Sequence, residues 1–240
     1  MTFFLLLDKI NINLYKKFQL ISKDVFNILA STHKVIATIV HQKIKRDFNI
    51  ELNLKKIQWG SVCPDVLPYY KLIRHYQNES IDYISNEISN LIYFCRYAKL
   101  EKNNNPILLN FLSKKLGIIS HYLSDYCCYP HAYRLTFFND MKAHIKYESD
   151  LNLYVMANKI NEENYSSVIM EKDLNLFENV DKKLRLRVKN YIENAIDEYK
   201  KMPIAYETDM NFALDLSSKI AYFVIESILA YNEDYEIQFC

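Results

Sequence analysis

Glycine and proline are scarce in this chain. Two glycines and five prolines occur among its 240 residues. A β-rich protein of this length needs many tight turns, and tight turns draw heavily on both residue types. Half of the residues are hydrophobic, and many of them recur at helical spacing in long stretches. The composition therefore argues against a β-rich fold and predicts an all-α protein.

The chain also lacks an excess of either charge. Its formal net charge is +1, and neither half is strongly basic. A protein that follows a nucleic-acid backbone needs a basic stripe along one face, so we expect no nucleic-acid partner. Disorder goes with low hydrophobicity and high net charge, and this composition shows neither. We expect a folded protein that is a monomer.

Long hydrophobic runs are missing as well. The apolar run nearest the N-terminus, residues 3–7, is five residues long and ends before Asp8. A transmembrane helix needs about 18 to 20 apolar residues. A secretory signal needs a basic start, a longer apolar stretch and a small-residue cleavage site. We therefore expect no transmembrane segment and a cytoplasmic protein, or a secreted one if the N-terminus is misassigned or processed.

The cysteines do not form the pattern of a secreted disulfide framework, because their number is odd and two are adjacent. They are Cys63, Cys95, Cys127, Cys128 and Cys240. We expect free thiols. Zinc ligation by Cys127 or Cys128 is the alternative, although no CxxC spacing supports it.

Helical periodicity predicts the following segments: residues 23–48, 71–76, 80–100, 106–128, 137–158, 173–201 and 208–231. Pro106 suits the first turn of its helix, which should stop before Pro130. Residues 57–67, IQWGSVCPDVL, contain Gly60 and Pro64, and they predict a loop that places Asp65. These elements predict a single compact domain over residues 1–240, with its chemistry in the first two thirds.

Histidines and carboxylates cluster in the middle of the chain. His121 and Asp125 are four residues apart and share a helix face, as do His144 and Glu148. His131 follows Pro130 and could turn back toward the first of these faces. Zinc binds imidazole nitrogens and carboxylate oxygens in small convergent sets, so the pattern predicts a metal site.

Gly117 lies one turn before His121 on the same helix face. A mid-helix glycine costs about 1 kcal/mol relative to alanine, so its presence suggests a close approach. Two interpretations stay open. Something passes close to the metal site at this point, or a second helix crosses over the glycine.

Five segments occur in the same order as in the zinc-dependent phospholipases C: STHKVIA, GSVCPD, RHY, HYLSDYCCYPHA and HIKYE. The HxxxD-x5-H segment and the later HxxxE also match that family in spacing. The resemblance covers about residues 30 to 150 and implies an all-α domain of the phospholipase C and P1 nuclease type. His41 falls outside the shared positions, and we interpret it as a solvent-facing helix residue.

The resemblance implies eight zinc ligands, all histidines or carboxylates: His33, Asp65, His75, His121, Asp125, His131, His144 and Glu148. One zinc would be held by Asp65, His75, His121 and Asp125, and a second by His131, His144 and Glu148. His33 would serve a third zinc, bridged by Asp125. The secreted family members complete that third site with an N-terminal tryptophan, whereas the single tryptophan here, Trp59, lies downstream. Two to three Zn2+ ions per chain are therefore expected.

The same resemblance implies a phosphodiesterase that acts on phospholipids at a membrane or micelle surface. It would release diacylglycerol and a phosphorylated head group, with Asp65 as the catalytic residue that supplies or orients the attacking oxygen. Three dications against three carboxylates would leave the pocket positive, which suits a phosphate-bearing substrate. Two alternatives stay open. One is a zinc-binding helical module with weak or no activity. The other is a P1-type nuclease, although those enzymes usually carry a histidine where this chain has Cys127.

Overall fold

The computed structural model describes residues 31–238, apart from residue 99, residues 101–104, residue 136 and residues 161–182. Over these residues the chain forms helices and no β-strand, so the all-α prediction is confirmed. The first described helix covers residues 31–48. The elements that follow are α2 (Leu54–Gly60), α3 (Cys63–Val66), the 3-10 helix η1 (Tyr70–Leu72), α4 (Gln77–Cys95), α5 (Pro106–Tyr126), α6 (Tyr129–Ala132), α7 (Phe137–Ala157), α8 (Leu184–Lys201) and α9 (Tyr206–Gln238).

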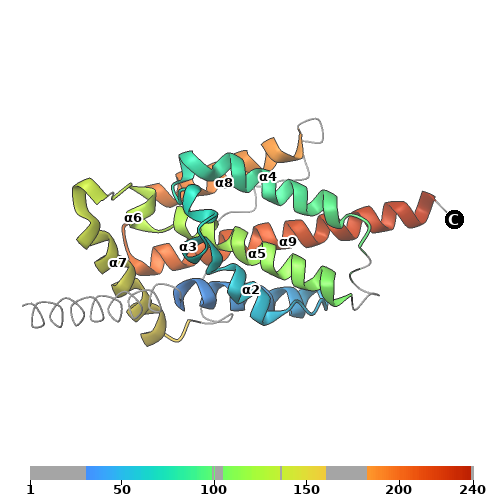
Figure 1. Cartoon of the computed structure of the whole chain (residues 1–240), viewed down its shortest axis with the longest axis horizontal. Helices are drawn as coiled ribbons and strands as arrows, with labels where there is room; N and C mark the ends of the chain where they lie inside the picture. The colour runs from blue at the N-terminus through green and yellow to red at the C-terminus, as the bar shows by residue number, and fades with distance from the viewer. Residues whose placement is uncertain (1–30, 99, 101–104, 136, 161–182, 239–240) are drawn as a thin grey trace, which may run out of the picture.

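Helices α5 and α9 pack against each other along the long axis of the molecule (Figure 1). On one side α4 packs against both α8 and α9, and on the other side α2 packs against α5. The short helix α6 and the helix α7 lie at one end, where α9 also begins (Figure 1). This arrangement gathers the middle segments of the sequence around one end of α5.

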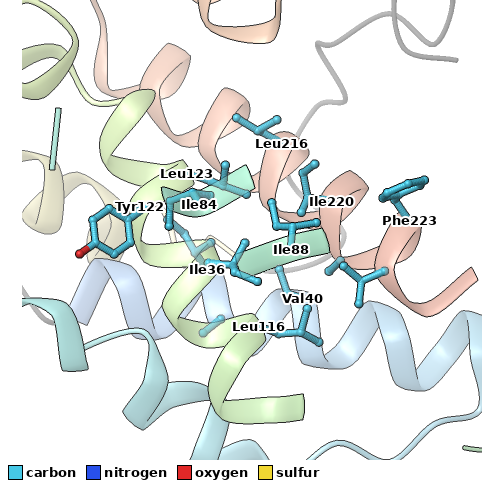
Figure 2. Packing of buried hydrophobic residues seen from close by; sticks show 14 of the residues in the cluster. Ile36, Val40, Ile84, Ile88, Leu116, Tyr122, Leu123, Leu216, Ile220 and Phe223 are labelled. Atoms are coloured by element: carbon cyan, nitrogen blue, oxygen red, sulfur yellow. The ribbon is translucent and has the colours of Figure 1, made fainter. Parts of the chain in front are cut away.

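The core consists of apolar side chains that recur at helical spacing. Ile36 and Val40 lie four residues apart on the first helix, and Ile84 and Ile88 do the same on α4. Figure 2 shows these side chains converging with others from α5 and α9, which are Leu116, Tyr122, Leu123, Leu216, Ile220 and Phe223. Each fully buried aliphatic side chain stabilises the fold by roughly 1.5–3 kcal/mol. The core therefore fixes α5 firmly between its neighbours.

Local sequence signals explain where α5 begins and ends. The Asn105 side chain accepts hydrogen bonds from the N–H groups of Ile107 (3.1 Å) and Leu108 (3.3 Å), and Pro106 occupies the first turn. The helix ends at Tyr126, and α6 begins three residues later with Pro130 in its first turn. This tight connection turns the chain back toward α5.

The chain's two glycines face each other where α2 crosses α5. A Cβ atom on Gly117 would lie 2.1 Å from the carbonyl oxygen of Ile57, and one on Gly60 would lie 2.2 Å from that of Lys114. Gly117 is therefore a packing glycine under a crossing helix. The predicted loop over residues 57–67 is wrong, because Gly60 serves this helix contact and not a turn. Pro64 fits into the first turn of α3.

Other predictions need smaller corrections. Residues 71–76 do not form a helix: η1 ends at Leu72, and Ile73 and Tyr76 have extended backbones before α4 begins at Gln77. The helices predicted at residues 106–128 and 137–158 are confirmed almost to their ends. Residues 23–30 and 173–182 of two other predicted helices lie outside the described residues. Among the helices that are described, none is long and apolar enough to cross a membrane.

Candidate metal centre

All eight residues predicted as metal ligands come together in the structure. They are contributed by the first helix, α3, the segment before α4, α5, α6 and α7. Their ligand atoms form three groups, within each of which all atoms lie within 4.8 Å of one another. The groups are His33, Asp65 and His121; His75, His121 and Asp125; and His131, His144 and Glu148.

Asp125 stands at the centre of this cluster. Its Oδ2 atom lies 3.0 Å from Nδ1 of His75 and 3.2 Å from Nε2 of His121. Its Oδ1 atom lies 3.5 Å from Nε2 of His33 and 3.9 Å from Nε2 of His131. The two oxygens thus face different histidines, which is the geometry that a bridging carboxylate requires.

A second carboxylate, Glu148, gathers the two histidines of the third group. Its Oε1 atom lies 2.9 Å from Nε2 of His131 and 3.0 Å from Nε2 of His144. Glu148 and His144 are one turn apart on α7, as the HxxxE spacing predicts, while His131 comes from α6. The α6 turn therefore brings His131 to a site that α7 otherwise forms.

Most of the imidazole rings are oriented by a hydrogen bond at Nδ1. The Nδ1–H groups of His121 and His144 point at the backbone carbonyls of Ser61 and Leu135, both at 2.9 Å. Nδ1 of His33 lies 2.9 Å from the hydroxyl of Ser124. Such partners fix the ring and leave Nε2 free to bind a metal.

The histidines and carboxylates shift one another's pKa values strongly. Burial lowers the pKa of both His121 and His131, but the neighbouring carboxylates, chiefly Asp125, raise both to about 9. Burial lowers the pKa of His33 to about 4, and His121 adds to this effect. Burial disfavours ionised Glu148, yet its hydrogen bonds to His131 and His144 bring its pKa to about 2. The pKa of Glu148 therefore lies far below neutral pH, and this carboxylate is ionised there.

The donor set fits zinc. It consists of imidazole nitrogens and carboxylate oxygens in small convergent groups, which zinc prefers. Buried Oδ2 of Asp125 accepts no hydrogen bond from any residue that the structure describes, although two imidazole nitrogens face it. A buried carboxylate oxygen without a partner is costly, and a cation would satisfy it.

A cavity of about 270 Å³ opens onto the cluster. Its apolar wall contains Ile36, Leu151, Met210 and Ala213. Cys127 and Cys128 also line the cavity, but neither belongs to the three ligand groups found among the described residues. Burial raises the pKa of both thiols well above the usual value and so keeps them protonated. The four cysteines within the described chain are free, as predicted.

One carboxylate of this cavity has no signal in the sequence, and one histidine lies elsewhere than predicted. Asp209, in the first turn of α9, lines the cavity, and burial raises its pKa to about 6. No histidine occurs in this part of the sequence, so no motif drew attention to it. His41 is not solvent-facing: it is 7% exposed, and its Nε2 atom lies 2.8 Å from the carbonyl oxygen of Leu52.

Comparison with known protein families gave a match to a zinc-dependent family. The sequence model of the family described as zinc dependent phospholipase C matches residues 32–216, which is well over half of the chain. The matched region includes all eight residues of the cluster and also Asp209. The chain therefore belongs to the zinc-dependent phospholipase C family. No curated protein and no solved structure matched the chain.

Proposed function

We propose that this protein is a zinc-dependent phosphodiesterase that hydrolyses phospholipids to diacylglycerol and a phosphorylated head group. The observation that carries the proposal is the convergence of eight histidine and carboxylate side chains in one cluster, seven of which line a cavity, in a chain of this family. The substrate would be bound at a membrane or micelle surface.

Two to three zinc ions would be held by the cluster. His131, His144 and Glu148 would hold one ion, and the distances of 2.9 and 3.0 Å from Oε1 of Glu148 to the two histidines support this assignment. The other site would use Asp65, His75, His121 and Asp125. His33 would serve a third ion next to Asp125, from which it is 3.5 Å away.

Zinc held by these residues would supply Lewis-acid catalysis, which polarises a phosphoryl oxygen and stabilises negative charge on a departing oxygen. His121 and His144 contribute by keeping Nε2 directed into the cluster, because the carbonyls of Ser61 and Leu135 bind their Nδ1–H groups. The apolar side chains that line the cavity would limit the access of bulk water to a bound substrate.

Asp65 is the residue that we assign to catalysis. Its side chain is 28% exposed, compared with 20% for Glu148 and 5% for Asp125, so it is the most accessible carboxylate of the cluster. It lies 3.6 Å from Nε2 of His121 and 3.7 Å from Nδ1 of His75. From this position it would orient a water molecule and accept its proton as the oxygen attacks phosphorus. The proton would then pass to the alkoxide oxygen of diacylglycerol when the P–O bond breaks.

The proposal is tested by incubating the zinc-loaded protein with phosphatidylcholine micelles and measuring release of the phosphorylated head group. General acid–base catalysis contributes about 100- to 10,000-fold, so Asp65→Asn should lower the rate by at least about 100-fold. Asp197→Asn is the matched control, because Asp197 is an exposed carboxylate on α8. Single-stranded DNA serves as a comparison substrate. Cleavage of DNA but not of lipid, or full lipase activity in Asp65→Asn, would overturn the proposal.

A further inference from the structure

Asp209 is a buried carboxylate that the proposed mechanism does not use. It is 2% exposed and lies in the first turn of α9, at the edge of the cavity. A buried carboxylate is costly unless several donors satisfy it. The donors that satisfy Asp209 show which parts of the molecule it joins.

Three hydrogen bonds reach Asp209 from three other helices. Its Oδ2 atom accepts one from the backbone N–H of Tyr129 (3.0 Å) and one from the hydroxyl of Tyr147 (2.9 Å). Its Oδ1 atom accepts one from the hydroxyl of Tyr199 (2.7 Å). The first two donors belong to α6 and α7, and the third belongs to α8.

The donors from α6 and α7 lie next to metal-binding residues. Tyr129 is the first residue of α6 and precedes His131 by two positions. Tyr147 directly precedes Glu148 on α7 and follows His144 by three positions. One oxygen atom of Asp209 therefore connects the two elements that together supply the site of His131, His144 and Glu148.

This connection matters because the ring of His131 is held at Nε2 by Glu148, another member of the same group, at 2.9 Å. Its Nδ1 atom is buried and has no hydrogen-bond partner among the described residues, unlike the Nδ1 atoms of His121 and His144. The position of its ring thus depends on the position of α6. That helix has four residues, and within the described chain its N-cap residue, Cys128, makes no side-chain capping bond. A helix this short is not stable without contacts from outside.

We propose that Asp209 is a positioning residue for the metal site formed by His131, His144 and Glu148. By capping α6 and holding α7 with the same carboxylate oxygen, it keeps His131 at the distance from Glu148 and His144 that lets all three bind one ion. The inference rests on the zinc-binding function proposed above.

The test is a zinc titration of the full-length protein against a competing chelator, which resolves the affinity of each bound ion. Loss of a partner in the outer shell of a metal site typically weakens metal binding about 10- to 100-fold. We expect Asp209→Asn, which replaces an acceptor oxygen by a donor amide, to weaken one zinc by that factor and to leave the others unchanged. In a His144→Ala background, where that site is already lost, Asp209→Asn should change no remaining affinity.

Two tyrosine variants separate positioning from general stability. Tyr147→Phe and Tyr199→Phe each delete one hydroxyl that is bonded to Asp209, at 2.9 and 2.7 Å, and both tyrosines are at least partly buried. Only Tyr147 belongs to a helix that carries metal ligands. Tyr147→Phe should therefore weaken the same zinc, whereas Tyr199→Phe should lower the melting temperature without changing zinc affinity. These variants also provide the test if Asp209→Asn does not fold.

The outcomes are distinguishable from a failure of the proposed lipase function. Selective loss of one zinc in Asp209→Asn and Tyr147→Phe supports the inference even if the protein cleaves no phospholipid. Equal weakening of every zinc, or unchanged affinities in both variants, would overturn it. A wild-type protein that binds no zinc would overturn both the inference and the proposed function.

Discussion

Replacing Gly117 by alanine tests the close crossing of α5 and α2, the helix that leads to Ser61 beside the metal centre. The added Cβ atom would lie 2.1 Å from the carbonyl oxygen of Ile57 and 2.8 Å from the backbone nitrogen of Ser61. Non-bonded heavy atoms prefer separations of about 3.5 Å or more, so the helices α2 and α5 would have to separate by more than about 1 Å. The obstructing atoms belong to the backbone, so no side-chain rotation can relieve the contact.

The magnitude follows from two opposing effects. Overpacking costs about 1–3 kcal/mol, and a rigid backbone obstruction places this variant near the upper end. Alanine is about 1 kcal/mol more favourable than glycine within a helix. The net destabilisation is therefore about 2 kcal/mol, which lowers the melting temperature by about 4–8 °C for a chain of this size. Zinc affinity should also fall, because α2 leads into Ser61, whose carbonyl orients His121.

Thermal unfolding followed by circular dichroism measures the effect, with and without zinc. Asn90→Ala is the control, because it introduces alanine at an exposed position of α4. That variant should unfold at or slightly above the wild-type temperature, since alanine is the better helix former. A melting temperature for Gly117→Ala equal to or above that of the wild type would refute the close crossing of α2 and α5.

Two further predictions concern the metal centre. The pKa values of His121 and His131 rise from 6.5 to about 9 on folding, so the metal-free folded state binds more protons than the unfolded state, and its stability should fall as the pH rises through this range. Zinc binding displaces these protons, so the difference in melting temperature between zinc-loaded and chelated protein should grow as the pH rises over the same range. A difference in melting temperature that does not change with pH would contradict this account. Asp125→Asn alters the carboxylate that faces four histidines and should remove more zinc than His144→Ala, which affects one group. Elemental analysis of both variants checks this order.

Five of the eight expected ligands could be predicted from local geometry, whereas His33, Asp65 and His75 followed only from the family resemblance. HxxxD and HxxxE place two ligands on one helix face at a fixed distance, whatever the rest of the fold does. Pro130 limits α5 and forces the turn that returns His131 toward α7. The structure brings these predicted residues together in three groups. Their roles as zinc ligands, and the extent of the domain over residues 1–240, stay predictions.

The errors came from residues whose role depends on distant partners. Gly60 indicated a turn because its partner, Gly117, lies 57 positions away in the sequence, and helix crossings leave no local pattern. His41 was predicted to face solvent, although the carbonyl of Leu52 binds it in the interior. Asp209 joins the cavity through contacts with α6, α7 and α8 that no motif encodes. Tertiary packing decides such positions.

The zinc content of the purified protein tests the central claim most directly. Protein purified without added zinc would be stripped of loosely bound ions and analysed for metal by elemental analysis, before and after zinc is added back. We predict two or three tightly bound zinc ions per chain, of which one is lost in His144→Ala. A protein that binds no zinc even after addition of the metal would contradict the account.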